Sequence, residues 1–244
     1  MKNITRIVST TFAALLLAPL YTSTCLADEA SVTKRISAWL GENAPDVRVS
    51  KAGFLDLYEV QIGAQLVYTN NDVSHIINGE IIDAATRINL TRKRMDVLSR
   101  VNFSDLPFEQ SIKLVKGNGE RVAATFEDPN CGYCRKLAKS LNEMDNYTIH
   151  TFLVPLLSPS SAEISKNIWC AKDRKEAWTN LMVHNIEPEA ADCAAPVEEV
   201  GKLARKLLIR GTPTIIFPDG SRVPGFMPRE DLEKALDQGT ADFR

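Results

Sequence analysis

Two cysteines, Cys131 and Cys134, are separated by two residues within FEDPNCGYCRKL, the segment from Phe126 to Leu137. A C-x-x-C pair of this kind fits half of a metal site, a structural disulfide or a reactive dithiol. The apolar residues before the pair predict a strand and residues 135–144 predict a helix, so the pair lies at a strand-to-helix junction. Unpaired backbone N–H groups and the helix dipole stabilise a thiolate there. This favours a reactive dithiol, with Cys131 as nucleophile and Cys134, one turn into the helix, as resolving thiol.

Residues around the pair are candidates for tuning it. Gly132 and Tyr133, between the cysteines, include no histidine that would add positive charge beside a thiolate. We therefore expect a less oxidising pair, suited to shuffling disulfides more than to inserting them. Asp128 is either a proton carrier or a turn residue at the end of the strand. Arg135 and Lys136 either help to hold the thiolate or belong to a solvated helix face.

The metal and structural-disulfide alternatives have weaker support. Structural zinc sites usually combine two close cysteine pairs, whereas Cys170 and Cys193 are 193 − 170 = 23 positions apart. We therefore predict no metal and no other cofactor. A bridge between Cys131 and Cys134 would close so short a loop that it contributes little chain entropy. The four cysteines from residue 131 onward allow three pairings, and their spacing alone does not choose among them.

The N-terminus predicts export. Residues 1–27 begin with Lys2 and Arg6, continue with the apolar run Phe12–Leu20, and end in small residues before cleavage after Ala27. Cleavage removes Cys25, and an even number of cysteines in an exported chain favours disulfides. The alternative is a lipoprotein with Cys25 as its lipidated first residue, although the residues before it are a poor lipidation signal. No apolar segment after residue 27 is long enough to cross a membrane.

The charge of the mature chain argues against nucleic acid as a partner. Removing residues 1–27 leaves 27 Lys and Arg against 31 Asp and Glu, a net charge of 27 − 31 = −4. No basic cluster with interleaved aromatic residues accompanies this mildly acidic balance. We therefore predict no nucleic-acid partner.

Residues 28–89 predict a small helix-plus-antiparallel-sheet domain. The helix is expected over Ser31–Leu40, and Asn78-Gly79 is typical of a two-residue hairpin. A domain of this size buries so little surface that its folding stability is marginal, so we expect it to pair with a second copy of itself. The strands are expected at Leu55–Val60, Ala64–Thr69, Val73–Ile77 and Glu80–Asp83.

A charged helix at Leu90–Val101 then predicts a linker, assigned to residues 90–103, ahead of a second domain at 104–244. This domain is expected to contain a hairpin at Asn118-Gly119 and a final helix closed by Gly239. Its strands are expected at 111–117, 121–128, 148–156 and 214–217. Its other helices are expected at 135–144, at 198–208, and after a capping box from Ser160 to Glu163.

The loop GTPT, with Thr212 and Pro213 directly before a strand, completes a family pattern. Together with CGYC, the segment IWCAKD (Ile168–Asp173) and the ending DG…VPGF, it resembles the DsbC/DsbG family of bacterial periplasmic disulfide isomerases. The resemblance covers nearly all of the mature chain. It implies an α+β fold: a cystatin-like N-terminal dimerisation domain, a linker helix and a C-terminal thioredoxin fold with a helical insertion.

The resemblance also implies roles for residues and partners. Cys131 would attack a wrong disulfide, Cys170 and Cys193 would form a structural disulfide, and Thr212-Pro213 would be a cis-proline loop facing the cysteines. The family forms homodimers that hold unfolded or misoxidised exported proteins, and a DsbD-type membrane reductase keeps the dithiol reduced. The leading functional hypothesis is therefore a periplasmic disulfide isomerase. A reductase for a narrow set of clients and a dimeric holdase-type chaperone are the alternatives.

Overall fold

The computed structural model describes residues 24–42 and 46–241, which form two compact units. One unit is drawn from Met1–Gln61 and Val67–Ile77, and the other from Ile62–Leu66 and Asn78–Arg244. Residues 1–23 of the predicted signal peptide lie outside the described residues. Helix α1 begins at Thr24, within the predicted peptide, but the side chain of Cys25 is not among those described. None of the helices in the described ranges is long and apolar enough to span a membrane.

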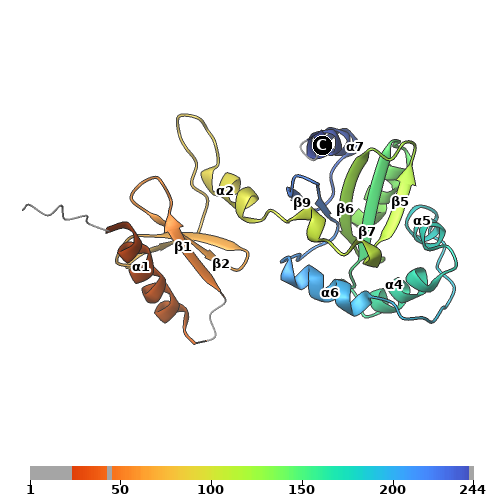
Figure 1. The fold of residues 1–244 in the computed structure, drawn as a ribbon, viewed down its shortest axis with the longest axis horizontal. Coiled ribbons are helices and arrows are strands. Elements are labelled where there is room, and N and C mark those ends of the chain that lie inside the picture. The colour runs from red at the N-terminus through yellow and green to blue at the C-terminus, as the bar shows by residue number, and fades with distance from the viewer. Residues whose placement is uncertain (1–23, 43–45, 242–244) are drawn as a thin grey trace, which may run out of the picture. The chain divides into compact units, whose positions relative to one another are not determined.

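The first unit is a helix packed on a small antiparallel sheet (Figure 1). Its elements are α1 (Thr24–Leu40), β1 (Val47–Lys51), β2 (Tyr58–Ile62), β3 (Gln65–Thr69) and β4 (Ile76–Ile77), with the strands in that order in the sheet. Val32 and Ile36, one helical turn apart, are fully buried, and Tyr58 and Tyr68 are buried on the strands. Helix α1 begins earlier than the periodicity predicted, and β1 was not predicted.

The hairpin predicted at Asn78-Gly79 is wrong. Strand β4 pairs with β3, before these two residues, and Ile82 after them forms only an isolated bridge to Asn89. The turn between β3 and β4 lies at Asn70, whose side-chain oxygen accepts hydrogen bonds from the backbone N–H groups of Ser74 (3.1 Å) and His75 (3.3 Å). The hairpin at Asn78-Gly79 fails because the strand predicted at Glu80–Asp83 does not form and leaves only the bridge at Ile82.

Helix α2 spans Leu90–Leu98 and is shorter than the predicted linker helix. The residues after it are held by the second sheet: the N–H of Val101 donates to the carbonyl of Gly220 (2.9 Å), and Arg100 donates to the carbonyl of Asp219 (3.2 Å). Gly220 has φ +84°, and a Cβ there would lie 2.6 Å from the oxygen of Val101. The contact therefore requires glycine at this position.

The second unit contains a five-stranded mixed sheet. Strands β6 and β7 are parallel, and the other neighbouring pairs are antiparallel. In sheet order the strands are β5 (Ile112–Lys116), β7 (Tyr147–Leu153), β6 (Arg121–Glu127), β8 (Thr214–Ile216) and β9 (Arg222–Pro224).

This order shows that the hairpin predicted at Asn118-Gly119 is wrong, because β7 lies between β5 and β6. The connection instead crosses the start of β7, where the N–H of Asn118 donates to the Asn146 side chain (3.2 Å) and Thr148 donates to the carbonyl of Gly119 (2.9 Å). A Cβ on Gly117 would lie 2.2 Å from the Asn146 side chain. The glycines therefore permit a close crossing, not a two-residue turn.

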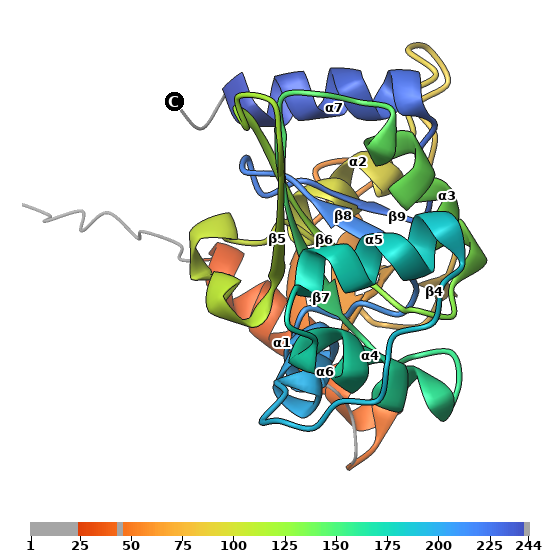
Figure 2. The same cartoon turned by 90° about the vertical axis from the view of Figure 1, so that its right-hand side faces the viewer.

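Helices cover both faces of this sheet, as Figures 1 and 2 show. Helices α3 (Gly132–Asn142) and α7 (Arg229–Ala241) pack on one face with Ala123 of β6, whereas α6 (Val197–Lys206) packs on the other with Ala124 and Phe126. This division follows the two-residue alternation of a strand. Helices α4 (Ser160–Cys170) and α5 (Arg174–His184) form an insertion between β7 and β8. Short 3-10 turns occupy Phe103–Asp105 and Phe108–Gln110.

Two predicted helix boundaries differ from the structure. Helix α7 continues past Gly239, whose Cβ would lie 2.7 Å from the Phe217 side chain, so this glycine allows the helix to approach the sheet closely. The predicted capping box at the start of α4 does not form, because no side chain caps this helix. Ser161 donates instead to the Asp128 carboxylate (2.8 Å).

Candidate active site

Cys131 is the N-cap residue of α3, at the end of the loop that follows β6. Its Sγ accepts a hydrogen bond from the N–H of Cys134 (3.3 Å), and its own N–H donates to the carbonyl of Asp128 (3.0 Å). The N–H that the start of a helix leaves unpaired is thus directed at the sulfur. This geometry stabilises negative charge on Cys131, as a nucleophilic thiolate requires.

Cys134 is fully buried, and both cysteines are free thiols in this structure. Burial raises the pKa of the Cys134 thiol far above its usual range, and the negative charge of Glu127 raises it further. A buried thiol of this kind attacks another sulfur only if a base removes its proton.

Glu127, at the end of β6, was not predicted to be a functional residue. Its carboxyl is almost fully buried, accepts a hydrogen bond from Thr125 (2.7 Å), and has one oxygen with no hydrogen-bond partner among the described residues. Burial raises the pKa of Glu127 to about 7, and the hydrogen bond from Thr125 opposes that shift. A carboxyl group with this pKa beside Cys134 is suited to accept the thiol proton. The signal in the sequence was a charged residue ending an otherwise buried strand.

The loop before β8 faces the nucleophile. The peptide bond between Thr212 and Pro213 is cis, and the Thr212 carbonyl accepts a hydrogen bond from the Cys131 thiol (3.1 Å). The Thr212 hydroxyl is buried and has no partner among the described residues. Two segments that are 81 positions apart in the chain thus meet at one sulfur atom.

The residues between the cysteines form an open surface. A Cβ on Gly132 would meet no atom within 4 Å. Tyr133 is 58% exposed, and its ring lies 6.4 Å from that of Phe226, with Lys136 above it at 4.9 Å. Lys136 is exposed on α3, which agrees with a solvated helix face, and its ammonium group lies over the exposed Tyr133 ring.

Arg135 differs from both suggested roles. Its guanidinium donates to the Asn185 side chain (2.6 Å) and to the carbonyl of Leu181 (3.1 Å), at the C-terminal end of α5. It also reaches the carbonyl of Pro129 (3.5 Å) in the loop before the cysteines. Arg135 therefore connects this loop to the helical insertion.

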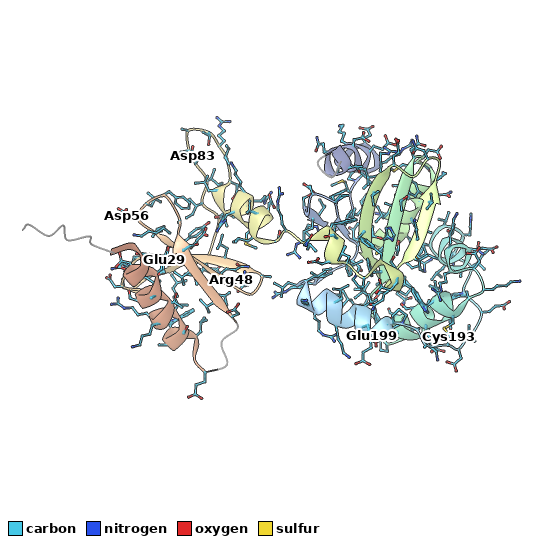
Figure 3. The ribbon with its side chains drawn as sticks, viewed as in Figure 1. Glu29, Arg48, Asp56, Asp83, Cys193 and Glu199 are labelled. Carbon is cyan, nitrogen blue, oxygen red and sulfur yellow. A yellow bond between two sulfur atoms is a disulfide. The ribbon has the colours of Figure 1, made fainter. Side chains whose placement is uncertain are left out.

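Cys170 and Cys193 form a disulfide. The bridge joins the end of α4 to the segment before α6 and is distant from the dithiol in sequence. Figure 3 labels Cys193 and, on α6, Glu199. Closing a loop of this length stabilises the fold by about 3 kcal/mol through restriction of the unfolded chain. Because their sulfurs are bonded to each other, these cysteines do not complete a four-cysteine zinc site. The described residues contain no cluster of three or more His, Cys, Asp or Glu side chains arranged for a metal ion.

Two family models match the chain. Residues 108–240 match the thioredoxin-like domain, and residues 23–92 match the disulfide bond isomerase protein N-terminal domain. The second match covers most of the first compact unit, and the first covers the sheet, the dithiol and the insertion.

Curated relatives and a solved structure agree with these matches. The probable thiol:disulfide interchange protein DsbC of Bordetella parapertussis is 49% identical over 180 residues, which are 74% of this chain and 64% of that protein. The chain thus spans slightly less than two thirds of this relative's length. DsbC of Escherichia coli K12 is 27% identical over 220 residues, 87% of this chain and 89% of the relative. A disulfide interchange protein from Neisseria gonorrhoeae matches with a TM-score of 0.54 and 33% identity, over 55% of this chain and 99% of that one.

Proposed function

The chain belongs to the thioredoxin-like family and, with its matched N-terminal domain, to the DsbC family; on this premise we propose that it reshuffles or reduces incorrect disulfides in exported proteins. The observation that carries the proposal is the position of Cys131. Its sulfur lies at a helix N-terminus, accepts the N–H of Cys134 and faces the Thr212 carbonyl before Pro213.

The first step is nucleophilic attack by the Cys131 thiolate on a client disulfide. A bond forms between Cys131 and one client sulfur, the client S–S bond breaks, and the other client sulfur leaves as a thiolate. The cis-proline loop offers backbone groups beside the sulfur where an extended client segment can pair with them.

Two routes release the client. In isomerisation, a second client thiolate attacks the client sulfur of the mixed disulfide, which forms a new client disulfide and restores the Cys131 thiolate. In reduction, Cys134 transfers its proton to Glu127 and attacks Cys131, which breaks the bond between Cys131 and the client, releases the client sulfur as a thiolate and leaves a Cys131–Cys134 disulfide. A two-electron reductant must then restore the dithiol, and we propose a DsbD-type membrane reductase for this step.

The proposal includes a location and a domain organisation. Residues 1–27 act as a cleaved export signal to the periplasm, 28–89 form the dimerisation domain, 90–103 the linker and 104–244 the catalytic domain. The disulfide between Cys170 and Cys193 is structural, and Gly132 and Tyr133 tune the dithiol. The match of residues 23–92 to the isomerase N-terminal domain supports the assignment of residues 28–89 as the dimerisation domain.

The function is tested with scrambled ribonuclease A in a glutathione buffer. Catalytic amounts of the protein are expected to restore ribonuclease activity, and the same protein alkylated with iodoacetamide is expected to restore none. Accumulation of reduced ribonuclease without recovered activity would identify a reductase instead. Equal recovery with alkylated protein would identify a holdase-type chaperone.

The oligomeric state provides a separate prediction. Because the first unit is small and has no disulfide among its described residues, we expect the processed protein to form a homodimer through it. Light scattering coupled to size-exclusion chromatography should give twice the mass of the processed chain. A monomeric mass across the micromolar range would contradict the dimer and leave the dithiol chemistry unaffected.

A further inference from the structure

Asp128 has an unusually complete set of hydrogen bonds for a fully buried carboxylate. One oxygen accepts from the N–H of Asn130 (2.8 Å) and the hydroxyl of Ser161 (2.8 Å). The other accepts from the N–H groups of Leu156 (2.7 Å) and Leu157 (2.8 Å). A carboxylate has about four lone-pair positions, so these four donors fill them. Both oxygens of the Asp128 side chain are therefore occupied by donors from the described residues.

The four donors come from separate parts of the chain. Asn130 belongs to the loop that ends at Cys131, Leu156 and Leu157 follow β7, and Ser161 lies in the first turn of α4. Asp128 thus joins the reactive loop to the beginning of the helical insertion.

Two neighbouring side chains strengthen the same connection. The Asn130 amide donates to the hydroxyls of Ser158 (2.9 Å), Ser160 (3.2 Å) and Ser161 (3.0 Å) at the start of α4. Arg135 links the carbonyl of Pro129 to the end of α5. The insertion therefore holds the reactive loop from the start of α4 and from the end of α5.

The backbone of Asp128 also binds the backbone of Cys131. The carbonyl of Asp128 accepts the N–H of Cys131, which sets the backbone of Cys131 in the N-cap conformation. In the N-cap conformation that Cys131 adopts, the Cys134 N–H points at the Cys131 sulfur. We propose that Asp128 is a positioning residue: by binding the loop to α4 and the segment after β7, it keeps Cys131 where a backbone N–H stabilises its thiolate. This inference deepens the proposed function, because it names what sets the reactivity of the dithiol.

Asp128→Asn tests the proposal with little change in size. An asparagine replaces one acceptor oxygen with a donor NH₂, so at least one of the two pairs of donors loses its partner. We expect Cys131 to be alkylated by iodoacetamide about tenfold more slowly at neutral pH, the change that corresponds to losing one hydrogen bond to a charged group. The equilibrium with glutathione should shift toward the protein disulfide, because the thiolate of the reduced form is less stabilised. An unchanged alkylation rate and an unchanged glutathione equilibrium would overturn the proposal.

Two milder variants test the proposal if the Asp128→Asn protein does not fold. Ser161→Ala removes one donor to Asp128, whereas Ser165→Ala removes a hydroxyl that is equally buried on α4 and has no hydrogen-bond partner among the described residues. We expect Cys131 to be alkylated more slowly in Ser161→Ala but at the wild-type rate in Ser165→Ala. Cys134 should remain protected from alkylation in both variants. Equal rates in the two variants, or rapid alkylation of Cys134 whenever Cys131 is affected, would overturn a positioning role.

These measurements need no client protein. The proposed isomerase function can therefore fail in the ribonuclease assay while the effect of Asp128 on Cys131 is still observed, and the reverse can also occur. The two results distinguish the two proposals.

Discussion

The Cys131→Ala protein is expected to restore scrambled ribonuclease A no faster than the glutathione buffer alone. Cys131 is the sulfur that accepts the Cys134 N–H and faces the cis-proline loop. Cys134 cannot replace it as the first nucleophile, because that thiol is fully buried and burial raises its pKa far above the usual range. The rate of recovered ribonuclease activity, measured at equal concentrations of wild type and variant, checks this prediction.

Cys134→Ser is the matched comparison for this result. The variant keeps the attacking thiolate but lacks the internal thiol that releases a client by reduction, so mixed disulfides should accumulate and be visible by mass spectrometry. Some isomerisation should remain, because a client thiol can still complete the exchange. Substantial recovery with Cys131→Ala would show that a client-binding surface, and not the dithiol, assists refolding.

Local patterns predicted the elements of the catalytic unit better than their pairing. The strand before the dithiol and the helix after it were predicted correctly, because alternation and helical spacing are properties of neighbouring residues. The place of β7 between β5 and β6 was not predicted, because the glycines at 117 and 119 resemble turn residues. Their actual requirement, a close crossing over Asn146 and Thr148, depends on residues about thirty positions away in the chain.

The same limit applies to the site. The type and spacing of Cys131 and Cys134 predicted a reactive dithiol only together with their place between a predicted strand and a predicted helix, and the family pattern added the Thr212-Pro213 loop. The arrangement around Asp128 was not predictable, because three of its four donors lie 28 to 33 positions further along the chain. Glu127 was missed for a different reason: its burial follows from the packing of α3 on the sheet, which a single strand does not reveal.

Glu127→Gln is expected to prolong the life of mixed disulfides, by about a hundredfold at neutral pH. Glu127 is the buried group beside Cys134 whose pKa burial raises to about 7, and glutamine cannot accept the thiol proton. The measurement is the rate at which Cys134 displaces a small thiol from a preformed mixed disulfide at Cys131. The same substitution at Glu59, a buried glutamate of β2, should leave that rate unchanged.

The same substitution should also change how stability depends on pH. The folded-state pKa of Glu127 is about 7, above the ordinary glutamate pKa of 4.5, because the carboxyl is buried, so the folded protein favours the protonated carboxyl. Its contribution to stability is then fully present below about pH 4.5 and is lost as pH rises through 7, a change on the order of 3 kcal/mol. Denaturant unfolding of the reduced protein should therefore show wild type losing stability relative to Glu127→Gln between pH 4.5 and pH 8. Parallel curves for the two proteins over this range would mean that Glu127 does not titrate there, and a proton acceptor for Cys134 would have to be sought elsewhere.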